Sequence, residues 1–204
     1  MLEQNNDDIL RCVDNPLPHT EGTFKSITDS VYYRSHPVYQ IDQKALSFVI
    51  YYDDFEFTNP LGSKTHKLAM FNWVLINIYP EFRSTFKVHN LLAVVMTKDL
   101  KEFGTEVILE SFISAMNQLG KERGVTLKLH CDDRVFRGLL NTVAGDTPAS
   151  GYLGGFKEGV GVALHPCRRC NITKLEMKEN FNALFFDLRT LDAHERQKCS
   201  IPKD

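Results

Sequence analysis

A continuous apolar run over residues 48–52 ends abruptly in a segment with the acidic residues Asp53, Asp54 and Glu56. Residues 48–52 are all β-branched or aromatic, which predicts a strand buried on both faces, because a half-exposed strand alternates apolar with polar positions. Burying an unpaired carboxylate is costly. The carboxylates are therefore expected either to mark the strand's exit into solvent or to converge on a bound cation.

A second apolar run, residues 135–146, also ends in a carboxylate, Asp146. Ligand sites of α/β sheets gather at the carboxyl ends of strands, so we expect Asp53 and Asp146 to face each other. Carboxylates from separate elements are suitable ligands for a pair of Mg²⁺ or Mn²⁺ ions. Alternation along a strand puts Asp53 and Asp54 on opposite faces, which makes Asp53 the first choice and Asp54 the alternative. The plain alternative is that all three are ordinary strand-end acids.

The remaining pattern predicts an α/β protein. Residues 67–78 and 88–96 read as two more strands that form a three-strand meander with the first, and apolar spacings of three and four predict a helix over 99–120. Residues 125–130 alternate like a half-exposed strand, and a helix is expected from Thr147, with Pro148 at its first turn, through Leu164. We expect a loosely packed arm over 1–43, a core over 44–165 and a small module over 166–204.

The last module contains cysteines and a histidine at metal-ligand spacing. Cys167 and Cys170 form a CxxC pair, and His194 and Cys199 follow with four residues between them. Together they predict a Cys₃His structural zinc site, the alternative being reduced thiols without metal. A thioredoxin-type redox pair is not favoured, because no strand leads directly into the CxxC segment.

Composition narrows the class of protein further. The chain has 204 residues, 43% of them hydrophobic, a formal net charge of −2 and a pI of about 6.4, so its overall charge does not attract nucleic acid. No apolar stretch reaches membrane-spanning length, and the acidic start is unlike a secretory signal. Five cysteines in such a chain predict reduced thiols and a nuclear or cytoplasmic location.

Several short motifs resemble a known family. The chain contains Tyr-Tyr-Asp-Asp-Phe-Glu at 51–56, Asn-Pro-Leu-Gly-Ser-Lys at 59–64, His-Lys-Leu at 66–68, Gly-Gly-Phe at 154–156 and the CxxC pair. These motifs resemble transposase-derived, largely uncharacterised proteins found in repeated copies in animal genomes. The order of predicted elements is similar to the ribonuclease-H-like core of DDE/D transposases and integrases.

This resemblance implies metal-dependent strand transfer or hydrolysis of DNA phosphodiesters, with Asp53 as the first metal ligand and Asp146 as the second. The family's third acidic ligand comes from a later helix, and no residue here matches it. The acids of the last module, Glu176, Glu179, Asp187 and Glu195, lie beside the predicted zinc ligands.

Three hypotheses follow from these residues. The first is a transposase-like nuclease core, truncated or degenerate, with DNA as partner by resemblance alone. The second is a non-enzymatic remnant that serves as a protein or nucleic-acid interaction domain. The third is an unrelated α/β domain with ordinary strand-end acids. The sequence leaves a homo-oligomer open under each of them.

Overall fold

A computed structural model describes residues 2–18, 20–57, 66–129, 132–156, 159–180, 182 and 186–200. The chain forms two compact units, Met1–Ala144 and Gly145–Asp204. The boundary between them therefore comes earlier than the one predicted after residue 165. The motif at 59–64 lies outside the described residues. Within the described part, no helix has the length and apolar character needed to cross a membrane.

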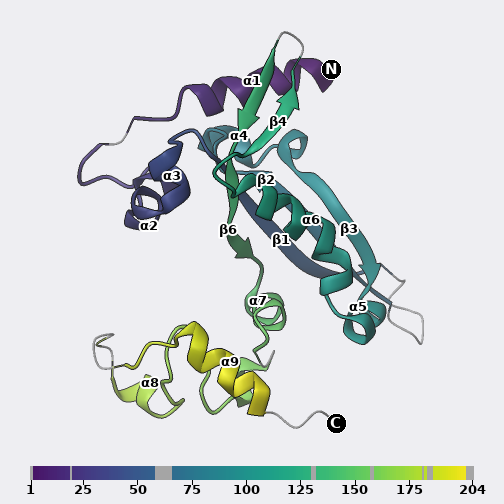
Figure 1. The fold of residues 1–204 in the computed structure, drawn as a ribbon. Helices are drawn as coiled ribbons and strands as arrows, with labels where there is room; N and C mark the ends of the chain where they lie inside the picture. Colours follow the sequence, from purple (N-terminus) through teal and green to yellow (C-terminus); the bar gives the residue numbers. More distant parts are fainter. Residues whose placement is uncertain are drawn as a thin grey trace. The chain divides into compact units, whose positions relative to one another are not determined.

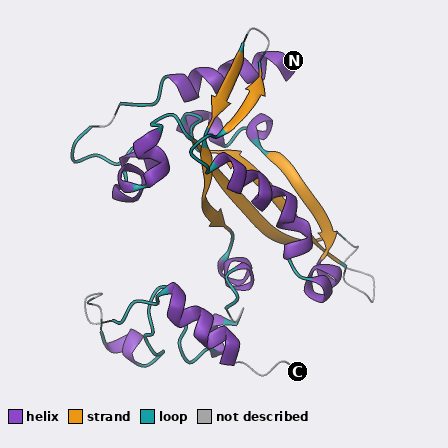
Figure 2. Cartoon of the chain, in the orientation of Figure 1, coloured by secondary structure: helices purple, strands orange, loops and turns teal. Residues whose placement is uncertain are grey.

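A four-stranded mixed sheet forms the centre of the first unit (Figures 1 and 2). Its strands are β1 (Leu46–Glu56), β2 (Lys67–Leu75), β3 (Asn90–Met96) and β6 (Gly138–Ala144), in the order β3-β2-β1-β6. β2 is antiparallel to both β1 and β3, whereas β6 runs parallel to β1. The predicted mixed α/β class and the predicted meander are thus confirmed.

Two helices follow the meander where one was predicted. They are α5 (Thr97–Phe103) and α6 (Glu106–Leu119), and Gly104 separates them with a φ of 81°. A positive φ suits glycine and ends a helix, which explains the break. Phe112 of α6 meets Phe48 of β1 edge to face at 6.3 Å between ring centroids. Between β2 and β3 lie the short helices α4 (Pro80–Arg83) and η2 (Phe86–Val88).

The N-terminal segment differs from the predicted loose arm. It contains α1 (Leu2–Asp14), η1 (Ile27–Asp29), α2 (Val31–Ser35) and α3 (Pro37–Ile41). The buried side chains described there are those of Cys12, Val13, Asp29, Tyr33 and Tyr39. Helices of three to five residues are too short to show an apolar period, and α1 is mostly polar, so hydrophobic patterning missed them.

A separate hairpin precedes β6. Its strands β4 (Val125–Lys128) and β5 (Asp133–Phe136) pair with each other, so the predicted strand over 135–146 is divided in two. The division falls before Gly138, where an added Cβ would lie 2.7 Å from the backbone oxygen of Leu46. Glycine therefore permits the close approach of β6 to β1.

The second unit has little regular structure among its described residues. It contains α7 (Thr147–Leu153), η3 (Val160–Val162), α8 (Glu176–Glu179) and α9 (Leu191–Ser200). The helix predicted to continue to Leu164 ends at Leu153, just before two glycines, of which Gly155 has a φ of 68°. The left-handed conformation of Gly155 does not continue a helix, which explains the early end.

Candidate functional site

Asp53 lies on the exposed part of β1, across from Met70 of β2. Strand alternation puts it on the same face as its exposed neighbour Tyr51, whereas Tyr52 is buried and stacks on Phe71 at 4.8 Å between ring centroids. The carboxylate of Asp53 therefore leaves the sheet on the side opposite the Tyr52 ring.

Asp54, the alternative ligand, already has two hydrogen-bond partners. The hydroxyl of Tyr52 donates to its Oδ1 at 3.0 Å, and the hydroxyl of Thr97 donates to the same oxygen at 3.3 Å. Thr97 is buried and begins α5. Asp54 thus links β1 to α5, a role that the sequence did not reveal because Thr97 lies 43 residues further along the chain.

Asp146 is the N-cap of α7. Its Oδ1 accepts a hydrogen bond from the backbone N–H of Ala149 at 2.8 Å, and Pro148 stands in the first turn. A helix starts here as predicted, but its N-cap is Asp146 rather than Thr147, which is the first residue of α7. An N-cap uses one carboxylate oxygen, so the second oxygen keeps its capacity to bind a cation.

The pairing of β1 with β6 relates the two predicted ligands by register. The parallel ladder runs from Leu46 opposite Gly138 to Tyr51 opposite Ala144. Asp53 and Asp146 each come two residues after the last pair of that ladder. The β1–β6 ladder thus stops two residues before each aspartate, whereas β1 itself continues along β2 to Glu56, so Asp53 lies within the strand rather than after it. Asp53 belongs to the first unit and Asp146 to the second.

Cys167 and Cys170 lie together in the second unit. The backbone N–H of Arg169 donates to Cys167 Sγ at 3.3 Å. Burial disfavours the Cys167 thiolate, but this N–H and a hydrogen bond with the Cys170 thiol outweigh it and lower the pKa of Cys167. Cys170 is buried, and burial raises the pKa of its thiol.

Backbone hydrogen bonds fix the turn that carries this pair. Cys170 forms an antiparallel bridge with Leu188, and the N–H of Arg189 donates to the carbonyl of Arg169 at 2.8 Å. The side chain of Arg189 adds a bond from Nε to the carbonyl of Cys167 at 3.0 Å. The two thiols are therefore held on an ordered turn.

The other two predicted zinc ligands do not join them. His194 and Cys199 both lie on α9, and five helical steps separate their directions by about 140°. The ring of His194 packs instead near that of Phe156, at 4.7 Å between centroids. In the described part of the chain, no group of three His, Cys, Asp or Glu side chains is placed to hold a metal ion.

The acids that the sequence left as weak candidates for a third ligand include one with a clear structural role. Glu176 Oε2 accepts hydrogen bonds from the backbone N–H of Thr173 at 2.8 Å and from its hydroxyl at 2.7 Å. The bond from the backbone lowers the pKa of Glu176. This carboxylate therefore stabilises the turn that leads into α8.

No family model matches the chain, and no curated protein is significantly similar to it. The chain is a mixed α/β protein with acidic residues at the end of β1 and an ordered CxxC turn.

Proposed function

We propose that the chain carries a ribonuclease-H-like, transposase-type core that cleaves or transfers DNA strands with Mg²⁺ or Mn²⁺. Asp53 and Asp146 would bind the metal, which would stabilise the negative charge that develops on the phosphodiester. The observation that carries the proposal is the parallel ladder of β1 and β6, because both strands lead into an aspartate two residues beyond their last pair.

The order of the elements gives further support. A three-strand meander, helices and a strand parallel to the first follow one another, which is the order that the family resemblance implies. The hydrogen bonds of Asp54 support Asp53 as the ligand from β1, since Asp54 is already engaged by Tyr52 and Thr97. The β4–β5 hairpin is an addition that the resemblance did not predict.

A cleavage assay on supercoiled DNA with Mg²⁺ or Mn²⁺ tests this function. The wild-type protein is expected to nick the DNA, and Asp53→Asn is expected to abolish nicking because a neutral amide binds divalent cations poorly. Asp54→Asn is the matched control, since it changes the adjacent carboxylate on the opposite face. Equal nicking by Asp53→Asn, or loss only in Asp54→Asn, would contradict the assignment.

A second function, a non-enzymatic interaction domain, is favoured by one observation. Large apolar side chains are exposed on the sheet face that carries Asp53, among them Tyr51, Phe55, Leu91 and Val94, as the pairing register shows. Exposed apolar patches often mark binding surfaces. Under this alternative the protein binds no divalent cation at Asp53, which separates it from the nuclease proposal.

Zinc binding by the second unit stays a prediction. Cys167 and Cys170 offer two thiolate ligands on one turn, and a Cys₃His site would require α9 to rearrange so that His194 and Cys199 meet them. We expect one equivalent of zinc in the purified protein and its loss in Cys170→Ser, measured by elemental analysis. A wild-type protein that folds fully after purification with zinc yet contains none would refute it.

A further inference from the structure

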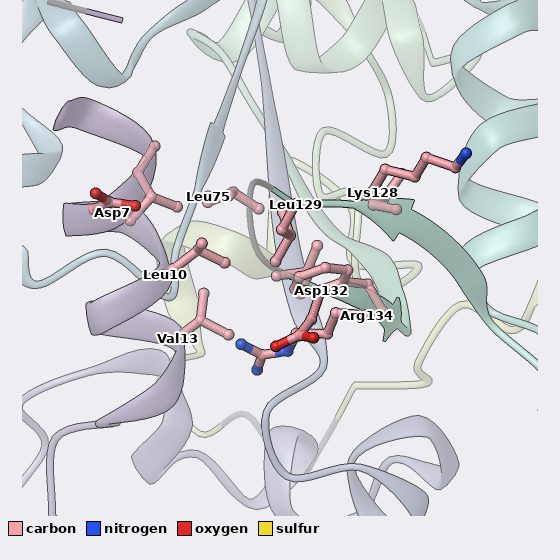
Figure 3. A pocket seen from close by; sticks show the side chains of 12 residues that line it. Asp7, Leu10, Val13, Leu75, Lys128, Leu129, Asp132 and Arg134 are labelled. Atoms are coloured by element: carbon pink, nitrogen blue, oxygen red, sulfur yellow. The ribbon is translucent and has the colours of Figure 1, made fainter. Parts of the chain in front are cut away.

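A cavity of about 810 Å³ lies between α1, one end of the sheet and the β4–β5 hairpin (Figure 3). Its walls are mainly apolar and come from all three parts, including Leu10, Val13, Leu46, Leu75, Leu129 and Phe136. Small-molecule sites in proteins are typically concave, mostly apolar and about 300–1,000 Å³ in volume. The size and walls of this cavity match that description.

The charged side chains that line the cavity do not all have a partner of opposite charge among the described residues. Arg134 is held by Asp14 through two hydrogen bonds of 2.9 and 2.6 Å, which pair its positive charge. Figure 3 shows the side chain of Lys128 extending away from α1. The carboxylates of Asp7 and Asp132 complete the charged lining, and neither forms an ion pair with another described residue.

We propose that this cavity binds a small apolar molecule with one positive charge, such as a compact alkyl amine. The apolar body would lie against Leu10, Val13 and Leu129, where it displaces water from apolar walls. The ammonium group would lie at the edge of the cavity, near Asp7 or Asp132. A carboxylate of the same shape would meet the same acids and bind more weakly.

The proposal is independent of metal chemistry. None of the residues that line the cavity is a proposed ligand of Mg²⁺ or zinc. Asp53→Asn is accordingly expected to bind the amine as well as the wild type does. An experiment can therefore refute the nuclease proposal without refuting amine binding, and the reverse.

Calorimetric titration with 1-aminoadamantane and with adamantane-1-carboxylate tests the charge preference. The two probes share an apolar cage and differ in the sign of their charge. We expect saturable binding of the amine, and Asp132→Asn is expected to weaken it about two- to five-fold, the effect of one partly exposed charge pair. No binding of the amine, or equal affinity for both probes, would overturn the proposal.

Leu10→Trp tests the location, because the larger indole would fill part of the cavity beside α1. It is expected to abolish amine binding, and Leu129→Trp on the opposite wall gives a second, independent obstruction. Leu91→Trp is the matched control on β3, where the leucine is 64% exposed. Unchanged affinity in the folded Leu10→Trp and Leu129→Trp proteins would place the binding elsewhere and overturn the assignment.

Discussion

Asp53 and Asp54 show how adjacent, identical side chains acquire different roles from strand geometry. Alternation along β1 sends them to opposite faces. On one face, Asp54 accepts hydrogen bonds from Tyr52 and Thr97 and so connects the strand to α5. On the other face, Asp53 is exposed beside Tyr51 and Phe55. Asp53 is therefore preferred as a ligand for two reasons: its own side chain is exposed, and the carboxylate of its neighbour Asp54 is already hydrogen-bonded.

The Asp14–Arg134 pair makes stability depend on pH. Hydrogen bonds from Arg134 lower the pKa of Asp14 in the folded protein below its unfolded value. The pair's contribution is therefore full above the unfolded pKa and disappears as pH falls through the lower, folded pKa. Because both side chains are about one-third exposed, we expect this contribution to be no more than about 1 kcal/mol at pH 7.

Urea unfolding of the wild type and of Asp14→Asn, at pH 7 and at pH 3, measures this effect. The variant is expected to be less stable than the wild type at pH 7, and the difference should shrink at pH 3. Asp8→Asn is the control, since Asp8 forms an exposed pair with Arg11 of the same helix. A difference in unfolding free energy that grows as pH falls would contradict the assigned sign.

At the scale of elements, Gly138 permits the parallel pairing on which the proposed site depends. A Cβ at this position would lie 2.7 Å from the Leu46 oxygen, closer than any normal contact. We expect Gly138→Ala to destabilise the protein by about 1–3 kcal/mol, as crowding of a packed position commonly does. Gly161→Ala is the control, because nothing lies within 4 Å of its added Cβ. Equal urea midpoints for the two variants would show that the β1–β6 contact tolerates a side chain.

The elements that the sequence predicted well are those with strong local patterns. Continuous apolar runs gave β1, β2 and β3, and the spacing of apolar residues gave α6. The break between α5 and α6 and the break before β6 depend on features that a hydrophobic pattern does not contain. Gly104 ends α5 through its backbone conformation, and Gly138 begins β6 through a contact with a residue 92 positions earlier.

In the candidate site, too, the residues with a local sequence signal were predictable and the long-range contacts were not. The aspartates at two strand ends and the CxxC pair could be read directly from the chain, because each depends on neighbouring residues. The link from Asp54 to Thr97 is a long-range contact without a sequence signal. The spacing of His194 and Cys199 predicted a pair of ligands, but it does not reveal that α9 is a regular helix through both residues.

At the scale of the whole molecule, the boundary between the two units falls between Ala144 and Gly145, directly before Asp146. The first unit contains the four-stranded sheet and Asp53, and the second contains Asp146 and the helix that it caps. In the proposed site these two carboxylates bind one metal centre. Metal binding must then depend on both residues, and on Asp54 not at all.

Calorimetric titration of Mg²⁺ and Mn²⁺ into the wild type, Asp53→Asn, Asp146→Asn and Asp54→Asn tests the proposed metal centre. Asparagine caps a helix about as well as aspartate, so Asp146→Asn removes the charge while it keeps α7 capped. We predict saturable binding by the wild type and Asp54→Asn, and none by the other two variants. Absence of binding in the wild type, or full binding by Asp146→Asn, would contradict a shared metal centre.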